Sequence, residues 1–217
     1  MLRTALRNAG REQAAAERAE RLAGRAADLA TLGKFTVLLA DPPWEESRPR
    51  SASRAIGNHY PTMPTEMIKK LKVPAADDAA LWLWCGGAML PEALAVMAAW
   101  GFRYRSNIVW VKPSPGMGIW VRAQHEHLLI GARGAMPLPA SLPASVVHAP
   151  RGEHSAKPGE FYDLIEAAHP GLPCCELFAR QRRPGWEAWG NELAGEWERA
   201  AEHNRQVFAR RDAKEQR

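Results

Sequence analysis

Short apolar segments that favour β-strands alternate with helix-forming segments through most of this chain. The sequence predicts strands over 35–40, 79–85, 104–111, 127–132, 146–148 and 173–178, and helices over 62–71, 90–100 and 158–168. Strands that alternate with helices typically form a parallel sheet whose two faces are covered by the helices. We therefore expect an α/β fold with a mainly parallel sheet and helices on both faces.

Charged segments flank this alternating region. Residues 1–30 and 194–217 are rich in Arg, Glu and Ala, and we expect charged helices on either side of one central domain over 31–193. Such helices are usually solvated surface elements, and a contact with an oligomer partner or with nucleic acid is the alternative. The total length of 217 residues suits one domain of ordinary size with a real core.

Composition and patterning exclude several classes of protein. Hydrophobic residues make up 46% and charged residues 24% of the chain, which is typical of globular proteins. No apolar run is long enough to span a membrane, and residues 1–25 lack the hydrophobic segment of a signal peptide. Cys85, Cys174 and Cys175 lie in apolar runs without zinc-type spacing, so we expect buried thiols in a reducing cytoplasm and no metal site. The net charge of +5 permits a polyanionic partner without requiring one.

The expected strand over 35–40 leads directly into Asp41-Pro42-Pro43-Trp44. Proline fixes φ and has no N–H, so this turn is stiff and offers mainly carbonyl acceptors. Asp41 adds a carboxylate and Trp44 a large aromatic face, a combination that suits the edge and face of an aminated base. Acceptors on both N–H groups of the adenine amine would free its lone pair to attack a methyl donor. The alternative is a structural turn at a strand end, with Asp41 as its cap.

Two further stretches carry side chains suited to ligands. Ligands of parallel sheets gather at the carboxyl ends of the strands, where the segments 112–125 and 180–191 are expected. The segments 45–60 and 112–125 lack periodicity and mix basic with aromatic residues, which suits a nucleic-acid groove, although a flexible surface is the alternative. The candidates for nucleic-acid contact are Arg48, Arg50, Arg54, Lys112, Trp120 and Arg122.

Eight segments between about residue 33 and residue 193 carry a more specific signal when they are taken in order. They are Ala40 to Trp44, His59 to Met63, Leu81 to Trp84, Ile108 to Lys112, Glu126 to Gly131, His154 to Pro158, Glu176 to Arg180 and Trp189 to Leu193. Together they resemble the MT-A70 family of adenine-N6 methyltransferases. The resemblance implies a Rossmann-like, S-adenosylmethionine-dependent methyltransferase fold with a permuted (beta-class) motif order, in which the catalytic turn precedes the cofactor strand. The sequence agrees with that order, because no strand with a glycine-rich turn precedes Asp41.

The resemblance also implies a role for the turn and its surroundings. Asp41 and the Pro42 carbonyl, on the turn that includes Pro43, would bind the target amine. Trp44 and Tyr60 would flank the target base or gate the site.

Residues at the later matched positions would bind the cofactor. The resemblance implies Lys157, Glu176, Phe178, Arg180, Asn191 and Glu192. Lys157 would face the methionine end of S-adenosylmethionine, and Arg180 and Asn191 would hold its ribose. Without the resemblance, Lys157 reads as a surface lysine, Arg180 as part of a surface ion pair and Asn191 as a helix cap. No segment before Thr31 matches the family, so the contacts to the cofactor adenine are unassigned.

The implied activity is methyl transfer to the N6 amine of adenine in nucleic acid. DNA is favoured over RNA, because compact members without an added RNA-binding module look like the branch found in prokaryotes and phages. The alternatives are the same chemistry on RNA, a non-catalytic nucleic-acid-binding subunit, and a glutamine-amide methyltransferase, against which Asp rather than Asn at position 41 argues. The expected partner is nucleic acid and not a membrane, and a homodimer or heterodimer stays open.

Overall fold

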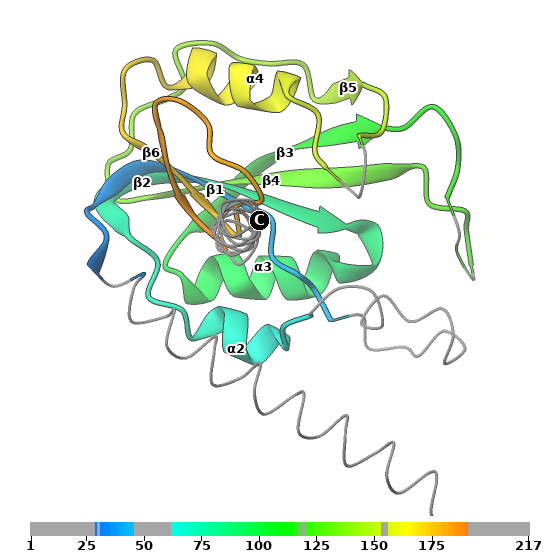
Figure 1. The fold of residues 1–217 in the computed structure, drawn as a ribbon, viewed down its shortest axis with the longest axis horizontal. Helices are drawn as coiled ribbons and strands as arrows, with labels where there is room; N and C mark the ends of the chain where they lie inside the picture. Colours follow the sequence, from blue (N-terminus) through cyan, green and yellow to red (C-terminus); the bar gives the residue numbers. More distant parts are fainter. Residues whose placement is uncertain are drawn as a thin grey trace, which may run out of the picture.

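One seven-stranded sheet organises the part of the chain that the structure describes, namely residues 29, 31–45, 62–116, 118, 120–152 and 156–190. In this computed structural model the strand order is β5-β3-β4-β2-β1-β6-β7 (Figure 1). The strands are β1 (Phe35–Ala40), β2 (Ala75–Gly86), β3 (Arg103–Val111), β4 (His125–Arg133), β5 (Val146–His148), β6 (Cys174–Leu177) and β7 (Trp186–Trp189).

All strands of this sheet except β4 run in the same direction. The pairs β1–β2, β1–β6, β3–β5 and β6–β7 are parallel, whereas β4 is antiparallel to both β2 and β3. The expected α/β fold with a mainly parallel sheet is therefore confirmed. The connection between β3 and β4 is a hairpin, which departs from the expected alternation of strands with helices.

Helices cover both faces of the sheet, as expected. The helices α2 (Thr65–Lys69) and α3 (Leu90–Ala99) lie below it in Figure 1, and α4 (Glu160–Ala168) lies above it. The indole N–H of Trp100, at the end of α3, donates to the Ile68 carbonyl of α2 over 2.9 Å and joins the two lower helices. A short 3-10 turn, Gly87–Met89, links β2 to α3.

Alternation along β2 builds the two halves of the core, because successive side chains of a strand point to opposite faces. Leu81 and Leu83 join the α3-side core, whereas Trp82 and Trp84 join the α4-side core. On the α4 side, Trp84 packs edge-on against Phe161 of α4, with ring centroids 4.7 Å apart. The strand is thus buried on both faces, which explains its nearly continuous apolar sequence.

The helix ends follow local sequence rules. Pro91 lies in the first turn of α3, where its missing N–H costs nothing, and Gly101 follows the helix with a positive φ of 81°. In α4, Phe161, Ile165 and Ala168 recur at helical spacing and are the buried residues.

Several expectations need correction. The strand β2 begins four residues earlier than expected, and α2 occupies only the middle of the expected 62–71 helix. The strand β7 was not expected, because Trp186–Trp189 lies within a stretch that the sequence marked only as polar. The expected terminal helices lie outside the described residues. All three cysteines are buried and free, and no helix in the described part of the chain has the length and apolarity of a membrane span.

Candidate active site

The Asp41-Pro42-Pro43-Trp44 turn leaves the carboxyl end of β1, between β2 and β6. The Asp41 N–H still donates to the Leu177 carbonyl of β6 over 3.4 Å, so the turn begins in register with the sheet. Within the turn, the Trp44 N–H donates to the Pro42 carbonyl and the Met63 N–H donates to the Pro43 carbonyl, both over 2.8 Å. The Pro42 carbonyl keeps a second lone pair for another donor.

Trp44 is anchored to the sheet rather than free in solution. Its indole N–H donates to the Trp84 carbonyl of β2 over 2.9 Å, and its ring packs against the α3-side core. This anchor fixes the shape of the turn, and it leaves only part of the ring surface available for contact with a base.

Lys157 lies at the centre of a chain of alternating charges. Its Nζ is 2.7 Å from Asp41 Oδ2 and 3.4 Å from Glu126 Oε2, and Glu126 also pairs with Lys112. The Lys157 Nζ lies 5.4 Å from the centroid of the Trp84 ring. The side chains of Lys157 and Asp41 are only 13% and 19% exposed, so the pair is largely shielded from water. The structure therefore brings together two predicted site residues that are far apart in the sequence.

The electrostatic environment keeps this network charged. Burial acts to lower the pKa of Lys157, but the Asp41 and Glu126 carboxylates outweigh it and raise that pKa. Burial likewise acts to raise the pKa of Glu126, and Lys157 and Lys112 outweigh it and lower that pKa. Ion pairing rather than burial thus decides the charge states here.

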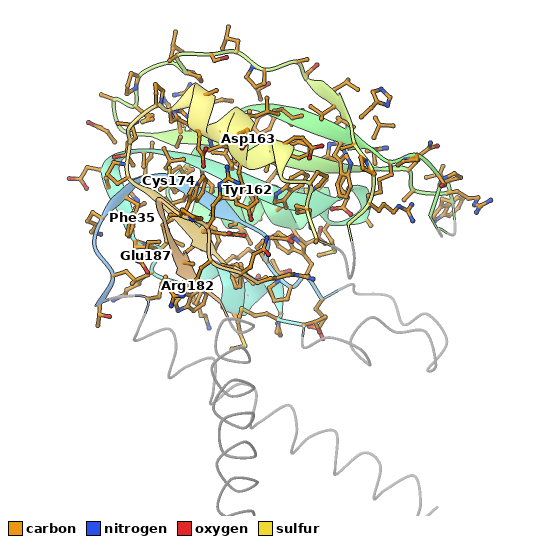
Figure 2. The ribbon with its side chains drawn as sticks, turned by 45° about the horizontal axis from the view of Figure 1, so that its top comes forward. Phe35, Tyr162, Asp163, Cys174, Arg182 and Glu187 are labelled. Carbon is orange, nitrogen blue, oxygen red and sulfur yellow. The ribbon has the colours of Figure 1, made fainter. Side chains whose placement is uncertain are left out.

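Glu176 is a second, less strongly paired acid at the same edge. It is the third residue of β6, is only 8% exposed, and accepts a 2.9 Å hydrogen bond from the Tyr162 hydroxyl of α4. Figure 2 labels Tyr162 on α4, beside the start of β6 at Cys174. Burial, reinforced by the charge of Asp41, raises the pKa of Glu176 to about 7 although the Tyr162 hydrogen bond opposes the shift. A carboxyl group that titrates near neutral pH is typical of functional sites.

The backbone after β6 adopts an unusual conformation. Phe178 has a φ of 63°, in the left-handed region that a bulky residue rarely occupies, and its ring packs edge-on against Trp189 of β7 with centroids 5.3 Å apart. The Ala179 N–H donates to the Trp189 carbonyl over 2.9 Å. A Cβ on Gly190 would lie 2.0 Å from the Ala179 carbonyl oxygen, so only glycine allows these two segments to approach so closely. Such strained backbone clusters at ligand sites.

The charged groups at this edge suit the methionine end of S-adenosylmethionine. That end carries an ammonium and a carboxylate, and the edge offers the acid Glu176 and the cation Lys157. Arg180 lies close enough for its charge to act on both Lys157 and Glu176. These residues fit the cofactor in chemistry, whereas Asn191 and Glu192 lie outside the described residues.

The residues expected to contact nucleic acid divide into two groups. Tyr60, Arg48, Arg50 and Arg54 lie outside the described residues. Lys112 is turned into the buried charge network, where it also lies 4.7 Å from the centroid of the Trp110 ring. That position is poorly suited to the phosphate contact that the sequence suggested.

The segment 112–125 joins β3 to β4, and its described residues before His125 are irregular, as the sequence suggested, with two backbone hydrogen bonds across it. The Lys112 N–H donates to the Gln124 carbonyl over 2.8 Å, and the Gly116 N–H donates to the Ala123 carbonyl over 2.7 Å. Trp120 is 89% exposed, and the exposed Arg122 donates to the Gly116 carbonyl over 3.2 Å. Both side chains are therefore accessible to a large partner.

Glu126 is the site residue that sequence reasoning missed. It lies on β4 and pairs with Trp110 of β3 and with Gly86 of β2, so its place beside Lys157 depends on antiparallel pairing. A carboxylate at the start of an apolar strand was the available signal, since such a charge is buried only when it is paired.

The sequence of this domain is similar to that of several known proteins. The family model described as MT-A70 matches residues 35–192. The Type II methyltransferase M.MunI of Mycoplasma sp is 31% identical over 182 residues, which cover 74% of this chain and 78% of that protein. The N(6)-adenosine-methyltransferase catalytic subunit METTL3 of Homo sapiens is 31% identical over 180 residues, and the MT-A70-like protein of Drosophila melanogaster is 32% identical over 180 residues.

The length covered differs between these relatives. The matched residues are 77% of this chain in both comparisons but only 30% of the human protein and 28% of the Drosophila protein, so the chain corresponds to less than a third of those relatives. The Asp41 turn, Lys157 and β6 all lie within the matched region. On this evidence the chain belongs to the MT-A70 family.

Proposed function

We propose that this chain transfers a methyl group from S-adenosylmethionine to the N6 amine of adenine in DNA. The observation that carries the proposal is the 2.7 Å pair between Lys157 and Asp41, at the end of β1 and within reach of the charge of Glu176. A structural turn would need no partly buried lysine and no second acid with a raised pKa at the same edge.

The residues at this edge divide the work. Asp41 would accept one N–H of the adenine amine and the Pro42 carbonyl the other, which localises the lone pair on the nitrogen. When bound, S-adenosylmethionine supplies a methyl group on a positively charged sulfur as the electrophile. Glu176 would hold the ammonium of the cofactor, and Lys157 would hold its carboxylate. If the proposal is correct, Lys157 has to release Asp41 when both ligands are present, and Glu126 remains as its second partner.

Asp41→Ala is the direct test. We expect it to abolish N6-methyladenine in DNA from expressing cells, measured by mass spectrometry of nucleosides, while calorimetry with S-adenosylhomocysteine shows an affinity close to that of the parent protein. Asp77→Ala is the matched control, because Asp77 is fully exposed and lies in the first half of β2. Methylation that persists in Asp41→Ala would remove Asp41 from the reaction.

The choice of DNA rests on the bacterial relative, and RNA is the second candidate. The match covers 78% of the Type II methyltransferase but only 30% of the human N(6)-adenosine-methyltransferase catalytic subunit, so the former is the fuller match. Parallel assays on single- and double-stranded DNA and RNA would separate the two substrates. Loss of binding as salt rises would be the expected electrostatic signature with either one.

A further inference from the structure

A cavity of about 410 Å³ lies on the α4 side of the sheet, and Asp41 is not among its lining residues. Its floor includes Trp82 of β2, Ile108 of β3 and Ile130 of β4. Ala80 and Ala132, which also line the cavity, pair near one end of the β2–β4 ladder, whereas Glu126 of the candidate active site pairs with Gly86 at the opposite end. The Trp84–Phe161 contact belongs to the core cluster between these two ends. The cavity is therefore separate from the candidate active site.

The roof of the cavity is the segment between β4 and β5, residues 134–145. Prolines at positions 137, 139 and 143 stiffen this segment. The Ala140 N–H donates to the Ala168 carbonyl at the end of α4 over 2.9 Å, and the Ala135 N–H donates to Asp78 Oδ1 over 2.6 Å. A roof that is stiff and tied at two points keeps the cavity open before any ligand arrives, as is usual for small-molecule sites.

The wall is mainly apolar, and its charge has one sign. Among the residues that line the cavity, Arg105 is the one Arg, and there is no Lys, Asp or Glu. No carboxylate of the wall therefore opposes the charge of Arg105. Burial lowers the pKa of His169, the other titratable residue of the wall, which keeps its ring neutral. An apolar interior with a single unopposed cation favours a molecule that has an apolar body and one negative charge.

Polar atoms of the wall also lack partners. Trp82 Nε1 and His169 Nε2 are buried and make no hydrogen bond with any residue that the structure describes. Both residues line the cavity. Buried ring N–H groups usually have a partner, and leaving one without a partner costs free energy. Both atoms have almost no surface open to a water-sized molecule, so a ligand would reach either one only if the wall moved.

The roof carries apolar side chains that nothing in the described residues covers. Leu138 is 91% exposed and Leu142 is 82% exposed, and both line the cavity. Large apolar side chains that gather at the mouth of a hollow are typical of binding sites rather than of ordinary surface. A ligand body in the cavity would shield one side of each leucine from water.

We propose that this cavity binds a small amphipathic organic anion, with its apolar body between the sheet and the 134–145 roof and its anionic group at Arg105. The site does not depend on the methyltransferase assignment, because it shares none of the residues that carry that assignment.

Anilinonaphthalene sulfonate, an apolar aromatic anion, is the probe for the test with the full chain. We expect a saturable fluorescence increase with one site per chain, and displacement by decanoate but much less by decanol. Arg105→Gln should weaken binding by about tenfold, the contribution of one charge-assisted hydrogen bond. Leu142→Asp, at an exposed position that leaves the core intact, should weaken it as well. In NMR spectra of the nitrogen-labelled protein, the indole N–H resonance of Trp82 should shift on binding. Its absence from the spectrum of Trp82→Phe identifies that resonance.

Lys72→Gln is the matched control, because it removes an exposed cation that does not line the cavity. It should bind the probe like the parent protein. Each of four results would overturn the proposal. They are equal affinity in all variants, binding at several sites without saturation, equal displacement by decanol and decanoate, and no binding of the probe. None of these results depends on methyl transfer, so they leave the test of Asp41 unaffected.

Discussion

Glu176 makes the affinity for the cofactor depend on pH, if its carboxylate holds the ammonium as proposed. Its pKa of about 7, raised first by burial, leaves roughly a tenth of the group ionised at about pH 6 and roughly three quarters ionised at about pH 7.5. Only the ionised form attracts an ammonium strongly, and the apparent Kd varies inversely with the competent fraction. We therefore expect binding to be about eightfold weaker at the lower pH, a difference of about 1.2 kcal/mol.

Calorimetry with S-adenosylhomocysteine at both pH values measures this difference. Because the bound ammonium favours the ionised carboxylate, binding at the lower pH should also release close to one proton, seen as a heat that changes with the ionisation enthalpy of the buffer. Glu176→Gln should bind weakly at both pH values and lose most of the pH dependence. Glu187→Gln is the matched control, since Glu187 is an exposed glutamate on the adjacent strand, paired with Cys175.

Two results would refute this reasoning in different ways. An unchanged Kd in Glu176→Gln would mean that Glu176 does not contact the cofactor. A parent protein whose affinity is flat between the two pH values, with weak binding in Glu176→Gln, would mean that the carboxylate is already ionised and that the argument from burial is wrong.

Three further changes test other parts of the site. Lys157→Met should lower the free energy of unfolding by about 2–4 kcal/mol in urea titrations, because it leaves Asp41 and Glu126 without their shared, partly buried cation. Lys69→Met is the control. It removes an exposed pair with Glu66 and should change the free energy of unfolding by less than about 0.5 kcal/mol. Glu176→Gln should stabilise the ligand-free protein by about 1–3 kcal/mol above about pH 7 and have little effect near pH 4. A carboxyl whose pKa is raised in the folded state contributes to stability while it is protonated, and that contribution is lost as the pH rises through the folded-state pKa. A variant that is less stable than the parent protein in thermal melts at pH 8 would contradict this sign. Gly190→Ala should weaken the binding of S-adenosylhomocysteine and lower the melting temperature, because its Cβ would overlap the Ala179 carbonyl oxygen beside β6. Gly33→Ala, whose Cβ meets nothing within 4 Å, is the control and should change neither quantity.

The elements that the sequence predicted are those with a strong local signal. The strand over 35–40 and the helix over 90–100 have unbroken apolar or periodic patterns between clear boundaries, and both lie where expected to within a residue. The sequence did not predict the strand β7, because Trp186–Trp189 has only four residues and only its two tryptophans are buried. The sequence also did not predict that β4 is antiparallel to its neighbours, because the apolar pattern of a strand does not depend on the direction of the strands beside it.

The candidate site shows the same limit at the level of single residues. Asp41 and β6 have local signals in the turn chemistry and the matched segments. The pair between Lys157 and Asp41 joins residues 116 positions apart, and the place of Glu126 is set by strand register. Local patterns do not determine such contacts, because only the completed sheet brings the partners together.

The position of β1 in the sheet constrains the order in which the protein matures during synthesis. Among the described strands β1 comes first in the chain, yet one of its two neighbours, β6, comes near the end of the described residues. Until residues 174–177 emerge, the apolar strand ahead of Asp41 has an open edge that can pair with the wrong chain. The turn at Asp41 is therefore completed late, and a chain interrupted before β6 would retain an aggregation-prone edge and would lack the proposed site.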